Sequence, residues 1–365
     1  MNIVSVGGRY KPTNGGNAKR ISTMCEAFCK LGHSVIVLTC DAYGSAANNE
    51  CISNVRVLRY KNCDELIHDL GNVSKEYSAN AILVHEETYL RKLRFANIKV
   101  PVFYECHAIE PNSNRLKEAI LTLIRKLYFK DNFTRNVFVL SKNAQGEFAD
   151  KFSYPINKVI YTPNGIDKSD GFSSRKNFSQ NTDFIYGYSG TLYEFQGICV
   201  LLKYAKDILA IAEDVKIMIV GGGPLEDEVR QYVHDNNLDD RIIVTGSVSQ
   251  SKFDELTSRF DVLLMPRPST PSTESAVPLK IFDAARHQKP VVMSNVSGLT
   301  EAFSEEAALI YDHMNPDEFI ECCKRIYRNT ELADELVKGE MDALLNWPTV
   351  EDVANRQIQA MEHNI

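Results

Sequence analysis

Short apolar runs alternate with longer segments of helical periodicity along the chain. Ile3–Val6 is rich in β-branched residues and predicts a strand, and Val35–Thr39 predicts another after a helical segment that ends at Leu31. A glycine-bearing loop to Gly16 separates the first strand from that helix. This order of strand, helix and strand is typical of a βαβ unit in a parallel sheet. The further strands predicted in the first half are Ala81–Val84, Val100–Tyr104, Val137–Leu140 and Val159–Tyr161.

The same alternation begins again after a polar stretch. Residues 167–183 contain few large apolar side chains and are typical of a connection between domains. We therefore predict two doubly wound α/β domains of Rossmann-like type, over 1–166 and 184–346, and a helix over 347–365 that crosses back to the first. Because open α/β sheets bind ligands beyond the carboxyl ends of their strands, we expect the site in a cleft between the domains. The strands predicted in the second half are Phe184–Tyr188, Lys216–Val220, Arg241–Val244, Val262–Met265, Pro290–Met293 and Ala308–Tyr311.

Composition fits two globular domains and offers no metal or redox motif. The 365 residues are 44% hydrophobic and 24% charged, which is enough to bury two cores. The nine cysteines are odd in number and form no CxxC pair, so we interpret them as reduced thiols. We find no signal peptide and no run near the roughly 20 apolar residues that span a bilayer. The expected localisation is cytoplasmic, either free or peripheral at a membrane.

Charge is distributed unevenly between the two halves. Residues 1–166 carry 22 Lys and Arg against 15 Asp and Glu, and the rest of the chain carries 19 against 33. Within the basic half, Arg115–Arg135 is helical in period and has six basic residues against Glu118 and Asp131. This segment fits an anionic membrane surface. It fits equally well a helix that faces solvent and packs through its apolar residues Leu116, Ile120, Leu123, Ile124 and Leu127.

Two glycines enter the first predicted helix. Gly15 and Gly16 allow close backbone approach to a phosphate, with the amides of the helix start aimed at the anion. An ordinary strand-to-helix turn is the alternative for a lone Gly-Gly pair. A nicotinamide-binding fingerprint would need three glycines and a later acidic residue, of which only Asp41 is present.

Several segments resemble glycosyltransferase family 4. The turn Thr162–Asp167 resembles the PNGVD sequence that joins the two domains of this family. The resemblance extends over nearly the whole chain and implies a GT-B fold, with two Rossmann-like domains and a sugar transfer that retains anomeric configuration. The other matching segments, in the family's order, are Gly32–Val35, Gly187–Gly197, Ile219–Pro224, Val244–Val248, Asp261–Pro266 and Pro290–Val292.

The resemblance implies two acidic contacts to the donor. Asp283 takes the place of the residue that binds the nucleotide ribose, where a carboxylate accepts hydrogen bonds from two vicinal hydroxyls. The common family spacing would put a sugar-contacting glutamate at Ser275. Because the chain offers Glu274 instead, as one branch of the family does, we assign this catalytic role to Glu274. An exposed loop glutamate is the alternative.

The donor diphosphate is expected to meet unusual partners. The family usually supplies an arginine and a lysine where this chain has Thr191 and Gln196. Because the leaving group gains negative charge, we predict that Arg267 and Lys280 replace them. Further donor-phosphate contacts are expected at Gly15, Gly16, Gly190, Val277 and Leu279, and nucleoside contacts at Gly246, Ser247 and Val248.

A histidine of the first domain is the second catalytic candidate. His107 follows a predicted strand in the segment Tyr104–His107, where the family often has a histidine near the donor sugar. It would bind a sugar hydroxyl or stabilise the cationic transition state, and a structural histidine is the alternative. His85, Glu86 and Glu87 are expected to form a loop after a strand.

The sequence thus predicts a glycosyltransferase that uses a nucleoside-diphosphate-sugar and a glycan or lipid-linked acceptor. No metal is expected, because the chain has no DxD motif, and no nucleic acid is expected as a partner. Because lipid-linked acceptors are frequent in the family, the resemblance favours the membrane interpretation of Arg115–Arg135. A sugar-nucleotide epimerase on the same fold and a binding protein without turnover are the competing hypotheses.

Overall fold

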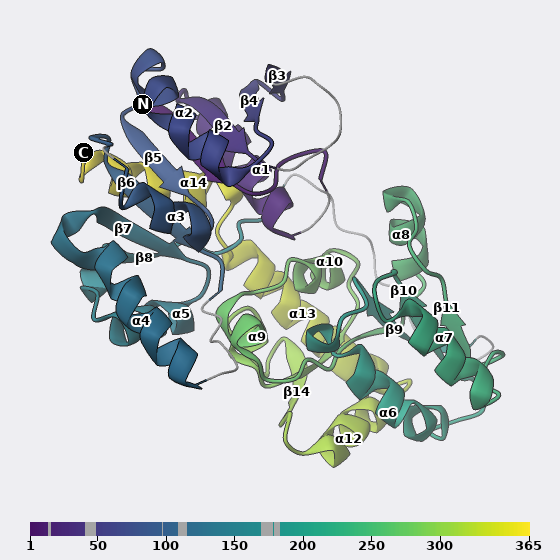
Figure 1. Ribbon diagram of the computed structural model, residues 1–365. Helices are drawn as coiled ribbons and strands as arrows, with labels where there is room; N and C mark the ends of the chain where they lie inside the picture. The colour runs from purple at the N-terminus through teal and green to yellow at the C-terminus, as the bar shows by residue number, and fades with distance from the viewer. Residues whose placement is uncertain (14–15, 41–48, 97, 109–114, 169–177, 179–182) are drawn as a thin grey trace. The chain divides into compact units, whose positions relative to one another are not determined.

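The computed structural model describes residues 1–365 except 14–15, 41–48, 97, 109–114, 169–177 and 179–182. The chain divides into two compact units, which Figure 1 colours along the sequence. Unit 1 is Met1–Gly165 together with Pro348–Ile365, and unit 2 is Ile166–Trp347. The predicted linker 167–183 falls largely outside the described residues, and so does Gly15.

Unit 1 is built on an eight-stranded sheet in the order β3-β4-β2-β1-β5-β6-β7-β8. All neighbours are parallel except β3 and β4. The order reverses between β1 and β5, and this switch point is where such sheets bind ligands. The strands are β1 Asn2–Gly7, β2 Ser34–Thr39, β3 Asn49–Ile52, β4 Val55–Arg59, β5 Ala81–Val84, β6 Val102–Cys106, β7 Thr134–Val139 and β8 Val159–Tyr161.

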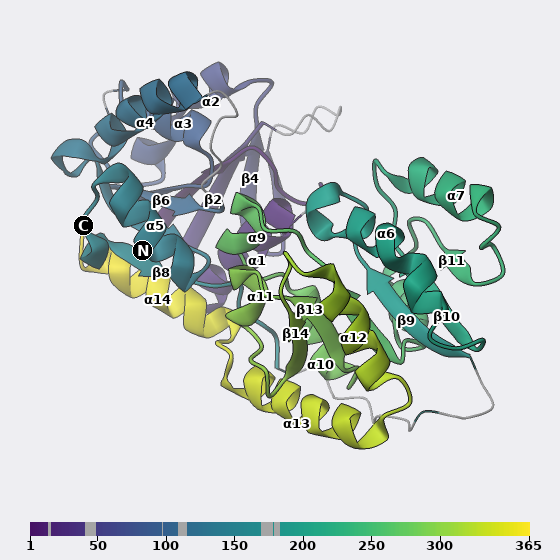
Figure 2. The ribbon, with the colours of Figure 1, turned by 90° about the horizontal axis from the view of Figure 1, so that it is seen from below.

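Apolar side chains cover both faces of this sheet because they alternate along each strand. Val4 and Val6 point into one core, whereas Ile3 points into the other. Helices α2 and α3 cover the first face, and α1 packs with α14 on the second (Figure 2). The helices of unit 1 are α1 Gly16–Lys30, α2 Cys63–Glu76, α3 Glu87–Leu93, α4 Arg115–Phe129, α5 Lys142–Phe152 and α14 Val350–Glu362.

The C-terminal helix returns to unit 1 through a close backbone contact. A Cβ atom at Gly165 would lie 2.6 Å from the Cα atom of Val350, so only glycine fits where the chain re-enters the unit. The α14 helix then begins with a capping box, in which the Thr349 side chain and the Asp352 side chain each bind the other's backbone amide. Its apolar face packs on α1 through Val353 and Ile358.

Unit 2 repeats the doubly wound plan with six parallel strands in the order β11-β10-β9-β12-β13-β14. Its switch point lies between β9 and β12. The strands are β9 Phe184–Ser189, β10 Val215–Val220, β11 Ile242–Val244, β12 Val262–Met265, β13 Val291–Ser294 and β14 Ala308–Tyr311. The helices are α6 Ile198–Leu209, α7 Glu226–Asp235, α8 Gln250–Thr257, α9 Pro271–Ser275, α10 Lys280–Arg286, α11 Ser297–Thr300, α12 Pro316–Ile326 and α13 Thr330–Asn346.

Two parts of the sequence-based prediction were wrong in detail. The hairpin of β3 and β4 was missed, because Arg56 and Arg59 interrupt its apolar pattern at the edge of the sheet. The helix predicted over Arg115–Arg135 ends at Phe129, and β7 begins at Thr134. A 3₁₀ turn follows α4, and a left-handed residue at Asn132, with φ of 55°, ends it.

Candidate functional site

The glycine-rich loop of unit 2 follows β9 at the switch point of the sheet. Its last glycine, Gly197, has φ of +90°, and a Cβ atom there would lie 2.1 Å from the carbonyl oxygen of Pro266. Only glycine therefore lets this loop pack against the segment that follows β12. The contact places Gly190, at the start of the loop, and Arg267 in one region beyond the carboxyl ends of the strands.

Two cations, the buried Arg267 and the partly buried Lys280, lie beside this loop. Arg267 is 5% exposed, and burial lowers its pKa to about 10. The Lys280 ammonium donates a hydrogen bond to the Ser189 carbonyl oxygen at 3.0 Å and lies 5.0 Å from the centre of the Tyr188 ring. Burial, together with the charge of Arg267, lowers the pKa of Lys280 to about 7. Within the described residues neither cation has a carboxylate partner, so the pair offers a site for an external anion.

Arg267 contacts one of the two residues whose usual charge it is predicted to replace. Its Nη2 atom donates to the side-chain oxygen of Gln196 at 2.9 Å, and Gln196 occupies the place of the family's usual lysine. The Nε atom of Arg267 is buried and has no hydrogen-bond partner within the described part of the chain. A buried N–H group without a partner is costly, which points to a ligand oxygen at this place.

Both carboxylate oxygens of Glu274 are engaged within unit 2. Ser269 donates its hydroxyl to Oε1 at 2.7 Å, and the Ser297 amide donates to Oε2 at 2.7 Å. Although partial burial raises its pKa, these hydrogen bonds lower the pKa of Glu274 overall. Glu274 therefore connects α9 to the start of α11. A hydroxyl of the donor sugar would have to share the Glu274 carboxylate oxygens with Ser269 and Ser297. Ser275, at the common family position, is buried and bonds the Pro271 carbonyl oxygen at 2.5 Å.

The remaining predicted donor contacts gather around the strand ends of unit 2. The Asp283 side chain is 45% exposed on α10 and lies 3.5 Å from Arg286. Gly246 and Ser247 follow β11, and Gly246 bridges to Gly221 after β10. Val248 is partly buried beside the core. Val277 and Leu279 precede a helix of only seven residues, and the Val277 side chain is fully buried in the core of unit 2.

In unit 1, the buried Glu105 near the carboxyl end of β6 is the centre of a hydrogen-bond network. Glu105, at 0% exposure, accepts hydrogen bonds from Arg20 at 2.8 Å, from His85 Nδ1 at 2.8 Å and from Gln357 of α14 at 2.9 Å. Burial alone would raise the pKa of Glu105, but the Arg20 charge, the nearby His107 ring and the hydrogen bond from His85 hold it well below its ordinary value. Glu105 is therefore an anion held by donors from separate parts of unit 1.

The tautomer of His85 follows from this network. Burial lowers the pKa of His85, so the ring is neutral and carries one N–H group. That group is assigned to Nδ1, which donates to the Glu105 anion, while Nε2 accepts from the Ser5 hydroxyl at 2.9 Å. His85 and Glu86 follow β5 in a loop as expected, whereas Glu87 is already the first residue of α3. The His85 side chain is buried and bonded on both sides.

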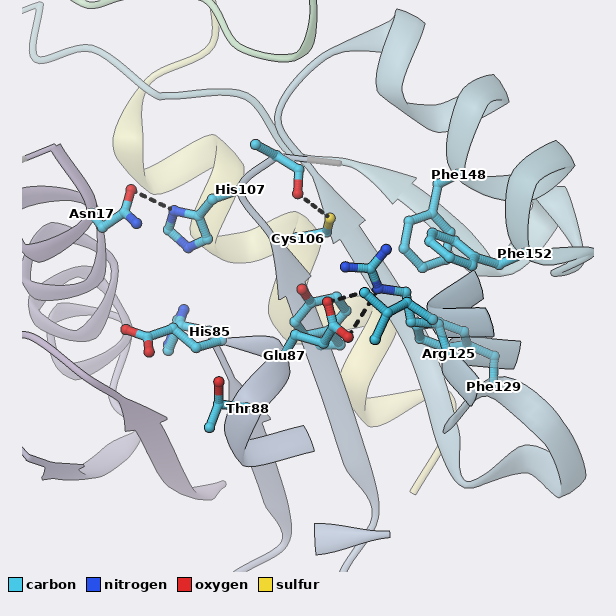
Figure 3. A pocket seen from close by; sticks show the side chains of 14 residues that line it. Asn17, His85, Glu87, Thr88, Cys106, His107, Arg125, Phe129, Phe148 and Phe152 are labelled. Carbon is cyan, nitrogen blue, oxygen red and sulfur yellow. Dashed lines mark hydrogen bonds and ion pairs between the residues drawn. The ribbon is translucent and has the colours of Figure 1, made fainter. Parts of the chain in front are cut away.

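His107 lies at the mouth of a hollow in unit 1. Its Nδ1 atom is 3.2 Å from the side-chain oxygen of Asn17, the residue after Gly16, and its Nε2 atom is 3.3 Å from Glu105. The hollow measures about 550 Å³ (Figure 3). Asn17 and His107 lie at one end, and Arg125 lies beside a group of phenylalanines at the other. This arrangement suits a ligand with both polar and apolar parts.

The glycine turn at the start of α1 has an acidic neighbour. Gly16 lines a second hollow of about 470 Å³ together with Glu86, whose Oε1 atom accepts from the Gly8 amide at 2.9 Å. Glu86 already accepts the Gly8 N–H group, and its negative charge faces a hollow that the Arg9 cation also lines, so the charge there is mixed. The cations of unit 2 are the better phosphate partners.

Three side chains of unit 1 have the composition of a metal site. His85, Glu105 and His107 offer ligand atoms that lie within 4.8 Å of one another. Both His85 nitrogens and both Glu105 oxygens already have partners, and a divalent cation there would lie beside the Arg20 guanidinium. The donor set therefore fits a charge-compensated network better than a metal centre.

Comparison with known protein families decides the class of the protein. The model described as Glycosyltransferase Family 4 matches residues 14–170, and the model described as Glycosyl transferases group 1 matches residues 183–329. The chain belongs to the family 4 glycosyltransferases. A relative of this glycosyltransferase is the GPI3 subunit of phosphatidylinositol N-acetylglucosaminyltransferase from Saccharomyces cerevisiae. The two are 18% identical over 389 residues, which cover 98% of this chain and 82% of the relative.

Solved structures show that the glycosyltransferase has the GT-B fold. Sucrose-phosphate synthase from Thermosynechococcus elongatus superposes with a TM-score of 0.79 at 17% identity, over 100% of this chain and 98% of that one. HepE from Anabaena, solved in complex with UDP, superposes with a TM-score of 0.77 at 14% identity over the full length of both chains. The predicted fold class is confirmed.

Proposed function

We propose that this glycosyltransferase moves a hexosyl group from a nucleoside-diphosphate-sugar to a glycan or lipid-linked acceptor with retention of configuration. The observation that carries the proposal is the pair of cations, buried Arg267 and partly buried Lys280, beside the Gly190 loop at the switch point of unit 2. Anabaena HepE, whose fold this chain shares, has been solved with UDP and with UDP-glucose, which supports a donor of this class.

In this proposal the cations stabilise the leaving diphosphate. Arg267 and Lys280 lie in a desolvated setting, where each contact to a developing negative charge supplies several kcal/mol, on the order of 3. Asp283 would bind the ribose, and the backbone from Gly246 to Val248 the base. The reaction needs no protein nucleophile, because the departing phosphate takes the proton of the acceptor hydroxyl. No metal is required.

Unit 1 supplies the acceptor side of the proposal. It would also contribute His107, which would bind a hydroxyl of the donor sugar or stabilise the cationic transition state, with its Nδ1 atom bonded to Asn17 and its Nε2 atom 3.3 Å from Glu105. The setting proposed for this chemistry is the assembly of cell-surface polysaccharides or glycoconjugates, in the cytoplasm and at the inner face of the membrane.

Consumption of donor and the fate of its sugar test the proposal. The full chain is incubated with UDP-, GDP- and ADP-sugars together with candidate acceptors, and the product is followed by proton NMR. Transfer with the anomeric configuration of the donor supports the proposal. Conversion of the donor without transfer would indicate an epimerase. Binding without any consumption would indicate a sugar-nucleotide-binding protein.

A further inference from the structure

An uncovered apolar stripe runs along α4 of unit 1. The interpretation of α4 as a helix that packs through five apolar side chains was wrong, because these side chains are exposed. The exposed fractions are Leu116 74%, Ile120 52%, Leu123 67%, Ile124 38% and Leu127 46%. With 100° per residue, these positions fall within one third of the helix circumference. An exposed apolar patch of this kind marks an interaction surface.

Basic residues border the stripe on both sides. Helical spacing places Lys117 along one edge and Lys126 along the other, and Lys130 follows directly after the end of α4. Lys126 is half-buried and donates to the Ser153 hydroxyl at 3.1 Å. Lys117 and Lys130 are exposed. Lysines beside an apolar stripe suit the boundary between lipid tails and anionic headgroups, because the ammonium reaches the headgroups while the stem covers apolar surface.

The end of α3 extends this patch. The Arg94 Nε atom donates to the Leu127 carbonyl oxygen at 3.1 Å, and the next residue, Phe95, is 80% exposed. Arg91, on the last turn of α3, is also exposed. We call the exposed residues of 91–95 and 116–130 the α3–α4 surface.

The geometry points to an anionic phospholipid bilayer as the partner of the α3–α4 surface. Here the chain combines exposed apolar side chains with Arg91, Lys117, Lys126 and Lys130, whereas the acidic Glu87 and Glu118 are paired with Arg125. In a symmetric contact between two copies, these basic borders would face each other and repel. No helix within the described residues is long and apolar enough to cross a bilayer, so the contact would be interfacial.

The opposite face of α4 connects this surface to the acceptor. Leu121, Arg125 and Phe129 recur every fourth residue on that face and line the 550 Å³ hollow next to His107. A bilayer on the α3–α4 surface would lie one helix diameter, about 10 Å, from the hollow. This assignment rests on the proposed function. The acceptor would be a membrane-anchored molecule whose polar group enters the hollow from the lipid surface.

Vesicle flotation tests the surface without reference to turnover. The full chain is mixed with vesicles of phosphatidylcholine containing about 30% phosphatidylglycerol, or of phosphatidylcholine alone, at about 0.1 M salt. We expect binding to the anionic vesicles and at least tenfold weaker binding of the double variant Ile120→Glu/Leu123→Glu. Both side chains are already exposed, so this variant should keep the wild-type melting temperature. The matched control is Leu345→Glu, at a residue 55% exposed on α13 of unit 2, and it should bind like the wild type.

Three outcomes would overturn the inference. They are failure of the full chain to bind anionic vesicles, equal binding by the double variant, and a concentration-dependent dimer that the double variant abolishes. The dimer would assign the surface to a second copy. Failure of the proposed function has a different signature, because vesicles would still bind while no sugar nucleotide was consumed.

Discussion

The desolvated charge of the partly buried Lys280 has opposite effects on stability and on binding. An ammonium without a carboxylate partner is costly to bury, but the same desolvation strengthens its attraction to a phosphate. Residues that destabilise the free protein in this way are characteristic of functional sites.

Replacement of this charge by an apolar side chain of similar length separates the two effects. For Lys280→Met at pH 6 we expect the free energy of unfolding to rise by about 1 kcal/mol, and the affinity for a nucleoside diphosphate to fall about 10-fold to 100-fold. Urea denaturation and titration calorimetry measure the two quantities. The exposed lysine Lys206 provides a control, since Lys206→Met should change neither. Lower stability combined with unchanged affinity would contradict the assignment.

The pH dependence of binding follows from the lowered pKa of Lys280. Folding moves this pKa from its ordinary 10.5 to about 7, so the unfolded chain binds more protons between these values. The contribution of Lys280 to stability therefore rises with pH across this window. A diphosphate binds the protonated form, so affinity should fall as pH rises above 7. Calorimetry from pH 6 to about 9 should show this fall in the wild type and a flatter profile in Lys280→Met; the same profile in both would exclude Lys280 as the cause.

At the scale of elements, the C-terminal helix α14 completes unit 1, because the chain returns to this unit after unit 2. The α14 helix supplies Gln357 to the buried Glu105, so a residue near the C-terminus supports a network that reaches His107. The crossing depends on the close approach of the backbone at Gly165 and Val350.

Alanine substitution measures the importance of that approach. Gly165→Ala would place a methyl group 2.6 Å from the Val350 Cα atom, and we expect a loss of about 1–3 kcal/mol in the free energy of unfolding. Gly146→Ala is the matched control, because Gly146 lies inside α5 with nothing within 4 Å of the new methyl group. That control should raise stability by up to about 1 kcal/mol. Equal effects of the two substitutions would contradict a tight crossing.

Sequence patterns predicted the central strands well and the Glu105 network poorly. Ala81–Val84 and Val262–Met265 are apolar on both faces, so a continuous run marks each strand at its observed bounds. The network joins residues 20, 85, 105 and 357, which no local pattern connects. The sequence offered one indication of this network, because the acidic Glu105 stands two positions before His107. Arg267 and Lys280 were predicted from the family's missing charges, and the structure places them after β12 and at the start of α10, near enough for the Arg267 charge to lower the pKa of Lys280.

At the scale of the whole molecule, charge separates the two parts of the chain. Residues 1–166 have an excess of seven positive charges, and this part contains the α3–α4 surface. The remaining residues have an excess of fourteen negative charges, yet Arg267 and Lys280 form a local positive site there. A bilayer contact by the basic part and a diphosphate contact by two isolated cations of the acidic part are consistent with this distribution.

Titration calorimetry of the full chain against UDP, GDP, ADP and NAD tests the central claim most directly. At least one nucleoside diphosphate should bind, and Arg267→Gln and Asp283→Ala should each weaken this binding while the melting temperature stays near that of the wild type. Binding of NAD alone, of no nucleotide, or of a diphosphate with undiminished affinity in both variants would contradict the assignment of the donor site to unit 2.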